Sequence, residues 1–454
     1  MSRGDRLSAR ALSVLLGASA IGALLSVLAV QWCRLNGWTD PGQHLAMCYS
    51  DFSLLFTERG LGEGLFPMLD PVPEHQVMEY PVLISVVAGS LAWLVNTLLP
   101  AGQGMEAERI LAFYDLNHLA VIGCWVGVVV ITALSTARSR RRDALLVALA
   151  PGIILSLSIN WDMWAVFLGA FALLLWGRGR PGWAGVLIGL GTAMKLYPLF
   201  FLGAILVLCL RTGRLQTFAA VIVPAALTWL AVNLPFMLSS FDQWARFWEF
   251  SSERGVGFSS MWLALAWTGW SGETFSLLSN GLFLVCCAGI TWLGLSAPVR
   301  PRMAQLCFLI VASFLLLGKV YSPQFVMWLI PLVVLANPRL RTFLLWQAAE
   351  VFHWASVWLI SAKITSQGQI GAEHYGFEVL YGVGIAVHMV MVIVLVLQVI
   401  GDIRHPERDP VRSAPSRVHD DGDPLAGPLA GVPDRWTLRR TPSSGIKNQE
   451  TEHA

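Results

Sequence analysis

Long apolar runs separated by shorter polar stretches are the main pattern of this sequence. The first run, residues 12–30, is long enough to cross a bilayer and lacks a small-residue cleavage site, so we expect an uncleaved signal anchor. Further spans are expected at about 109–134, 144–159, 163–177, 183–196, 198–210, 216–238, 276–296, 303–318, 323–336, 342–361 and 376–400. The pattern therefore predicts about twelve transmembrane helices.

Several of these runs have only about 15 residues, which is short for a hydrocarbon core about 30 Å thick. We expect such helices to end below the outer surface and to line a wet cavity, where irregular backbone is tolerated.

Composition agrees with this picture. Of 454 residues, 55% are hydrophobic and 13% are charged, whereas a soluble domain has roughly 25% charged residues. The fold class predicted is an all-α polytopic membrane protein, with one membrane domain at residues 1–400 that includes a first extracytoplasmic loop at 33–108. Residues 401–454 are rich in Pro, Asp, Arg and Ser, which predicts a disordered cytoplasmic tail.

The placement of arginine predicts the orientation. Three arginines precede the first run, so the N-terminus is expected to be cytoplasmic. The loop at 33–80 carries seven acidic residues against two arginines, which suits the outer side. All other basic clusters are expected on the inner side, and these are residues 138–142, Arg178/Arg180, Arg211/Arg214, Arg300/Arg302, Arg339/Arg341 and the tail from Arg404.

One apolar run, residues 81–99, does not fit this orientation as a full span. If it crossed the membrane, residues 138–142 would lie outside. We therefore expect a juxtamembrane helix on the outer face, which begins at Pro81 and ends before Pro100.

Polar residues then gather at the outer rim of the predicted bundle. Asp51 follows the first span, and only four lysines are present, of which Lys195 and Lys319 lie beside apolar runs, an expensive place for an ammonium group. The candidate site residues are Asp51, Glu79, Tyr80, Asp162, Lys195, Tyr197, Lys319 and Gln324, together with the tryptophan-rich loop at 239–275.

Structural roles are also open for several of these residues. Asp51 and Asp162 could each cap the helix that follows, and the two lysines could extend to the membrane interface. Cys33 and Cys48 could pair if their loop is extracytoplasmic. The histidines show no ligand spacing, so no metal is assigned, and no cofactor is expected.

The chain resembles glycosyltransferase family 87, whose members are type C membrane enzymes that use polyprenyl-phosphate sugars. The resemblance lies in four stretches in family order: YSDFSLLFTERGLGEG, EYPVL, INWDMWAVFLGAFALLLWGRGRPGWAGVLIGLGTAMKLYPLF and KVYSPQFVMWLIPLVVLANP. Some members carry histidines near the last motif, and this chain has none there.

The resemblance implies a bacterial plasma-membrane enzyme with its active site on the extracytoplasmic face. An acidic residue in the first outer loop is the catalytic base of that class, which maps onto Asp51, with Asp40 in the turn WTDPG as second choice. Lys195, and then Lys319, are the candidates for holding the donor phosphate. Glu79, Tyr80, Asp162, Tyr197 and Gln324 are the candidates for binding substrate; Glu79 and Asp162 could equally orient Lys195.

The expected reaction is inverting transfer of a sugar, by family mannose, from the polyprenyl-phosphate donor to a lipid or glycan acceptor in cell-envelope synthesis. The bilayer is the expected partner, and no nucleic acid is. A flippase for lipid-linked sugars and a non-catalytic scaffold for envelope assembly are the alternatives. A transporter would spread its charged residues through the membrane depth, whereas these gather at one rim.

Overall fold

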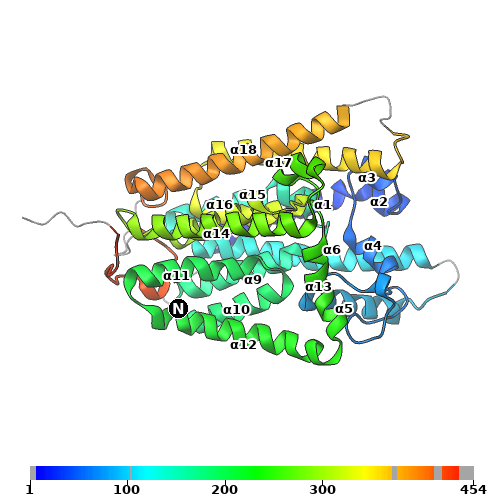
Figure 1. The fold of residues 1–454 in the computed structure, drawn as a ribbon, viewed down its shortest axis with the longest axis horizontal. Helices are drawn as coiled ribbons and strands as arrows, with labels where there is room; N and C mark the ends of the chain where they lie inside the picture. The colour runs from blue at the N-terminus through cyan, green and yellow to red at the C-terminus, as the bar shows by residue number, and fades with distance from the viewer. Residues whose placement is uncertain (1–6, 103–104, 371–375, 414–421, 439–454) are drawn as a thin grey trace, which may run out of the picture.

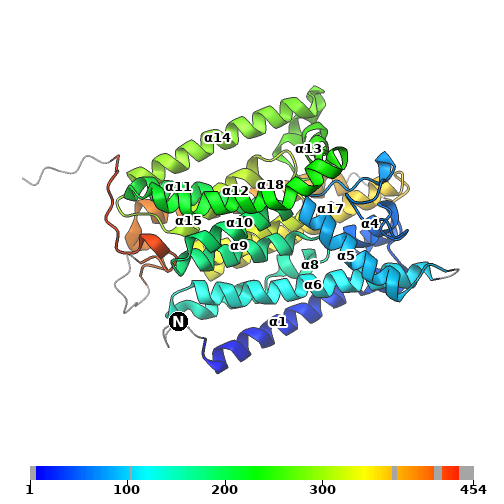
Figure 2. The same ribbon diagram turned by 90° about the horizontal axis from the view of Figure 1, so that it is seen from below.

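The computed structural model describes residues 7–102, 105–370, 376–413 and 422–438, and its regular elements there are all helical. Among these residues, six helices are long and apolar enough to cross a membrane: α1 (Ala9–Ala29), α6 (Glu106–Ser135), α12 (Leu215–Ser239), α14 (Gly272–Ser296), α17 (Leu340–Thr365) and α18 (Gly376–Arg404). They lie roughly parallel along the long axis of the molecule (Figures 1 and 2). The polytopic all-α prediction is confirmed.

Shorter apolar helices fill the middle of the bundle. These are α9 (Asp162–Gly177), α10 (Pro181–Met194), η3 (Tyr197–Phe200) with α11 (Phe201–Thr212), α15 (Met303–Leu317), and η5 (Pro323–Phe325) with α16 (Val326–Ala336). Every residue of α16 is buried. By contrast, α1, α12, α14 and α18 expose many large apolar side chains, which is favourable only against lipid.

The expected span at 144–159 is not one helix. Residues 138–144 form the 3₁₀ helix η2 (Arg138–Ala144), followed by the separate short helices α7 (Leu145–Ala148) and α8 (Pro151–Ser156). The break has a local cause: Pro151 cannot donate a backbone hydrogen bond, and its ring drives Ala150 into extended backbone. The prediction of a continuous helix here is wrong.

Helices α10 and α12 approach closely through small residues. A side chain at Gly185 or Gly189 would collide with the backbone carbonyls of Val221 or Ala225 on α12. This is the small-residue spacing that lets membrane helices pack backbone to backbone, and it holds the C-terminal end of α10, where Lys195 lies, in place.

The first loop and the juxtamembrane helix gather at one end of the bundle. Helix α5 (Val82–Leu98), the short helices α2 (Gln31–Asn36), α3 (Gly42–Leu45) and α4 (Asp51–Glu58), and α13 (Phe241–Glu253) all lie there, to the right in Figures 1 and 2. The 3₁₀ helices η1 (Glu74–Gln76) and η4 (Met261–Thr268) lie within the same loops. Cys33 and Cys48 form a disulfide, so the pairing left open by the sequence is made.

The opposite end carries the basic clusters and the start of α1. Arg140 donates to the carbonyl of Pro410 at 3.0 Å, and Arg339 pairs with Asp402 at 2.7 Å. The clusters therefore share one end, as the arginine pattern predicted.

Part of the tail is folded against this end, around η6 (Pro406–Arg408) and η7 (Gly427–Leu429). Asp409 pairs with Arg302 at 2.7 Å, and both side chains are fully buried. Asp434 pairs with Arg211 at the same distance. The expectation of disorder is wrong for residues 405–413 and 422–438, because their carboxylates neutralise arginines that the bundle buries; the other tail residues from 414 lie outside the described ones.

Replacing Asp409 by Asn is expected to destabilise the protein by roughly 3–5 kcal/mol, because it removes the ion-pair partner of the buried Arg302 guanidinium. The effect is measured as the temperature at which the protein, purified in detergent, ceases to be monodisperse. The matched control is Glu407→Gln in the same segment, whose side chain is 68% exposed, and it should change little. Equal behaviour of the two variants would contradict the packed tail.

Candidate active site

Asp51 is the first residue of α4, and it is not the cap of that helix. The cap is Ser50, whose hydroxyl accepts from the Phe52 amide at 3.1 Å and donates to the Ser158 carbonyl at 2.6 Å. The Asp51 amide donates to the carbonyl of Ile159 at 2.7 Å. The backbone thus fixes Asp51 against the segment between α8 and α9, and leaves its carboxylate available.

Neighbouring polar side chains hold that carboxylate. The Tyr80 hydroxyl donates to Asp51 Oδ2 at 2.5 Å, and the side chains of Tyr49 and Asn160 also hydrogen-bond to Asp51. Burial raises the pKa of Asp51 above its ordinary value, and the hydrogen bonds from Tyr80 and Tyr49 and the charge of Lys195 oppose that rise. Burial and the Asp51 charge raise the pKa of Tyr80, which keeps its phenol a donor.

Asp162 and Lys195 form an ion pair beneath Asp51. Asp162, the first residue of α9, is completely buried, and its Oδ1 accepts from the Trp328 indole nitrogen at 2.6 Å. Its Oδ2 lies 3.3 Å from Lys195 Nζ, close enough for an ion pair although the angles do not make a hydrogen bond. The Asp162 side chain therefore binds these two partners and does not cap α9. Lys195 points inward to this carboxylate and does not extend to the membrane interface.

Tyr80 links Asp51 to Lys195, the partner of Asp162. Its hydroxyl donates to Asp51, while the centroid of its ring lies 4.9 Å from Lys195 Nζ, a cation–π arrangement. Asp51, Tyr80, Lys195 and Asp162 thus form one connected cluster, and we call these four residues the central cluster.

Lys319 belongs to a second cationic group with Arg254, a residue that sequence reasoning missed. Lys319 Nζ donates to the Ser252 carbonyl at 2.9 Å and to the Ser276 hydroxyl at 2.7 Å. Burial and the charge of Arg254 lower the pKa of Lys319. Arg254 is exposed, and Tyr80, Asp51 and Glu79 act on its charge, so it lies within electrostatic reach of the central cluster. Its one sequence signal was its place in the tryptophan-rich loop.

The remaining candidates are placed around the cluster. Glu79 forms a two-pronged pair with Arg59, with both N···O distances 2.9 Å, and does not contact Lys195. Tyr197 is buried and packs 5.2 Å, between ring centroids, from the Trp328 ring that donates to Asp162. Gln324 is buried in η5, and its Oε1 has no hydrogen-bond partner. Tyr49 and Trp328 are site contacts that sequence reasoning did not single out.

An apolar pocket borders the central cluster. It is formed by α5, α10, α12 and α13, and its lining includes Pro81, Leu196, Trp229, Trp244 and Trp248. Pro81 and Leu196 directly follow Tyr80 and Lys195 in the chain. The pocket therefore opens beside the polar cluster on the side of the juxtamembrane helix.

The fold and the site define a polytopic membrane protein with an acidic and cationic centre at one end of its bundle. The sequence profile of glycosyltransferase family 87 matches residues 80–323, more than half of the chain. The chain belongs to this family and is a membrane glycosyltransferase, which confirms the resemblance. The matched region includes Tyr80, Asp162 and Lys195, and begins after Asp51.

No curated protein matches the sequence. Among solved structures, the chain is similar to the crystal structure of ArnT from Cupriavidus metallidurans bound to undecaprenyl phosphate. The identity is 12%, the alignment covers 87% of this chain and 78% of that one, and the TM-score is 0.44.

The Asp51 carboxyl should titrate above the ordinary aspartate pKa of about 3.9, because burial disfavours its charged form. Replacing Tyr80 by Phe removes a hydrogen bond that stabilises the carboxylate, so the midpoint should rise further. The infrared difference between each protein and its Asp51→Asn counterpart isolates this carboxyl. Tyr197→Phe is the control, because its hydroxyl lies elsewhere. A midpoint lowered by Tyr80→Phe would contradict the assignment.

Proposed function

We propose that this protein transfers a sugar from a polyprenyl-phosphate donor to a hydroxyl group of a lipid or glycan acceptor, with Asp51 as the general base. The observation that carries the proposal is which carboxylates of the site are ion-paired and which is not. Asp162 pairs with Lys195 and Glu79 pairs with Arg59, while no described residue forms an ion pair with Asp51. Asp51 is therefore the carboxylate left to accept a proton.

Its environment suits that role. A base works best when its pKa approaches the working pH, and burial raises the pKa of Asp51 in that direction. The acceptor oxygen forms a bond to the anomeric carbon, the bond from that carbon to the phosphate oxygen breaks, and the acceptor proton passes to Asp51. Attack from the face opposite the phosphate inverts the anomeric carbon, so a β-linked donor, by family a mannosyl one, gives an α-linked product.

The phosphate departs as an anion, so the reaction needs no acid to protonate it. It needs cations, and the site supplies Lys195, Arg254 and Lys319. Charges at the edge of a low-dielectric region interact strongly with an anion that enters it. Tyr80 and Asp162 then serve to set the position of Lys195 and the protonation of Asp51.

The apolar pocket supports a lipid-linked donor. It lies between the juxtamembrane helix α5 and helices α10, α12 and α13, and its lining includes Pro81 and Leu196, which follow Tyr80 and Lys195 in the chain. A polyprenyl chain lying along these apolar side chains would bring its phosphate to the cationic groups.

The site is proposed to face the extracytoplasmic side of the bacterial plasma membrane. Disulfides persist in oxidising compartments and are rare in the cytosol, and the Cys33–Cys48 bond lies at the site's end of the bundle. The arginine clusters lie at the opposite end, as the positive-inside rule places them.

Purified wild type should transfer mannose from polyprenyl-phosphate mannose to membrane-lipid acceptors, and Asp51→Asn should lower the rate about 10²–10⁴-fold, which is the usual contribution of a general base. Product formation and donor binding are measured together. Asp40→Asn is the control, because Asp40 lies in the same loop, is half exposed and contacts His44. Unchanged transfer by Asp51→Asn would refute the base. Donor movement without product would favour a transporter, and neither activity would favour a scaffold.

Arg254→Gln should raise the donor KM by roughly tenfold or more, which is what losing a hydrogen bond to a charged group costs. The measurement is transfer rate against donor concentration. Arg246→Gln is a close control, since Arg246 and Arg254 both lie over the Phe250 ring, at 5.9 and 5.6 Å. Equal effects of the two substitutions would argue against a phosphate contact by Arg254.

A further inference from the structure

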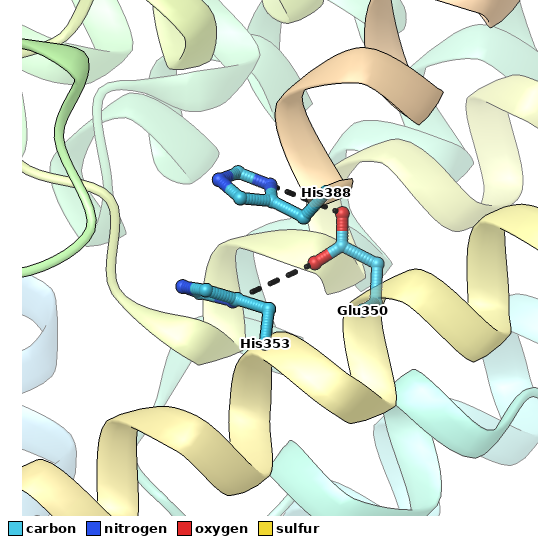
Figure 3. Close-up of side chains that lie close together, drawn as sticks. All are labelled: Glu350, His353 and His388. Atoms are coloured by element: carbon cyan, nitrogen blue, oxygen red, sulfur yellow. Dashed lines mark ion pairs between the residues drawn. The ribbon is translucent and has the colours of Figure 1, made fainter. Parts of the chain in front are cut away.

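Three metal-ligating side chains meet inside the bundle, away from the central cluster. Glu350 and His353 lie on α17 and His388 lies on α18, and the three are 3%, 0% and 2% exposed. Figure 3 shows the carboxylate and the two imidazole rings side by side. One ligand atom from each residue lies within 4.8 Å of the others, and this is the one such group of three or more found among the described residues.

The hydrogen bonding of this cluster is incomplete. Glu350 accepts from the Trp346 indole at 2.9 Å and from the Tyr321 hydroxyl at 3.2 Å. His353 Nδ1 and both ring nitrogens of His388 have no hydrogen-bond partner. No described lysine or arginine pairs with Glu350. A buried carboxylate and buried ring nitrogens left in this state are costly.

A divalent cation would satisfy all three residues at once. His353 Nδ1 lies 4.0 Å from Glu350 Oε2, and His388 Nδ1 lies 3.6 Å from Oε1. Ligand atoms around a tetrahedral zinc ion are about 3.3 Å apart, given bond lengths near 2.0–2.1 Å. The two rings are stacked, with centroids 4.4 Å apart and planes inclined by 29°, so both must turn toward the carboxylate for their Nδ1 atoms to share one ion. Two histidines and one glutamate are a known zinc ligand set, with a fourth position open.

The surroundings supply the second layer of contacts that metal sites use. His353 Nε2 lies 2.6 Å from the Ser259 hydroxyl, which orients the ring and leaves Nδ1 toward the carboxylate. The Trp346 indole orients Glu350 in the same way. A small pocket lined by Ser259, Tyr321 and His388 borders the cluster.

We propose that Glu350, His353 and His388 bind a zinc ion that ties α17 and α18 to the outer loops of the bundle. Those loops meet beside the cluster: the Gly257 amide donates to the Lys319 carbonyl at 2.9 Å, and the Tyr321 amide donates to the Phe258 carbonyl at 3.2 Å. The ion thereby fixes the backbone that carries Lys319. Histidine spacing alone predicts no metal here, because the ligands come from two helices and one is a glutamate.

The metal content of the full chain tests this directly. The protein is purified with a tag that contains no polyhistidine and without chelator, and its metals are quantified by mass spectrometry. We expect about one zinc ion per chain, the stoichiometry of a single site. After chelation and dialysis, added Co²⁺ should give the visible absorption of a tetrahedral site, which added Zn²⁺ abolishes.

Glu350→Gln and His353→Asn should each lose the zinc and the cobalt absorption. His118→Asn is the matched control, because His118 is also a buried histidine of a long helix and bonds Ser26 at 3.2 Å. It should keep both signals. Wild type that holds no stoichiometric metal and gives no cobalt absorption would overturn the proposal, whether or not the variants fold. Equal loss in His118→Asn would overturn it too.

Discussion

The ion pair between Asp162 and Lys195 is the interaction on which the site depends. It joins the first residue of α9 to the last turn of α10, and Trp328 of α16 donates to the same carboxylate. Asp162 is fully buried, and removing one member of a buried pair typically costs about 3–5 kcal/mol because the other charge is left unpaired. The pair also positions the Lys195 ammonium group against the Tyr80 ring, and the Tyr80 hydroxyl in turn donates a hydrogen bond to Asp51.

The two aspartates of the site, Asp51 and Asp162, have different partners. Asp162 and Asp51 are both first residues of helices in buried surroundings, yet one is neutralised by a lysine and the other is held by neutral donors. In the proposed mechanism these different partners give the two carboxylates different roles. The short helices α9 and α10 contribute by bringing Asp162 and Lys195 together at their ends.

The sequence predicted the features that depend on local pattern. The apolar runs, the juxtamembrane helix after Pro81 and the shared end of the arginine clusters all appear. The break at Pro151 was a local signal that the length of the run obscured. Ion pairs between distant parts of the chain could not be predicted from the sequence. The pairs of Arg59 with Glu79 and of Arg302 with Asp409 depend on three-dimensional proximity.

A double-mutant cycle on transfer activity would test whether the ion pair organises the site. Asp162→Asn, Lys195→Met and the double variant would be compared by kcat/KM for the polyprenyl-phosphate donor, at matched protein levels. If the pair acts as a unit, the double variant should lose less than the sum of the single losses, with a coupling of roughly 0.5–3 kcal/mol. Strictly additive losses would mean that the two residues act independently, and that the site does not rest on their contact.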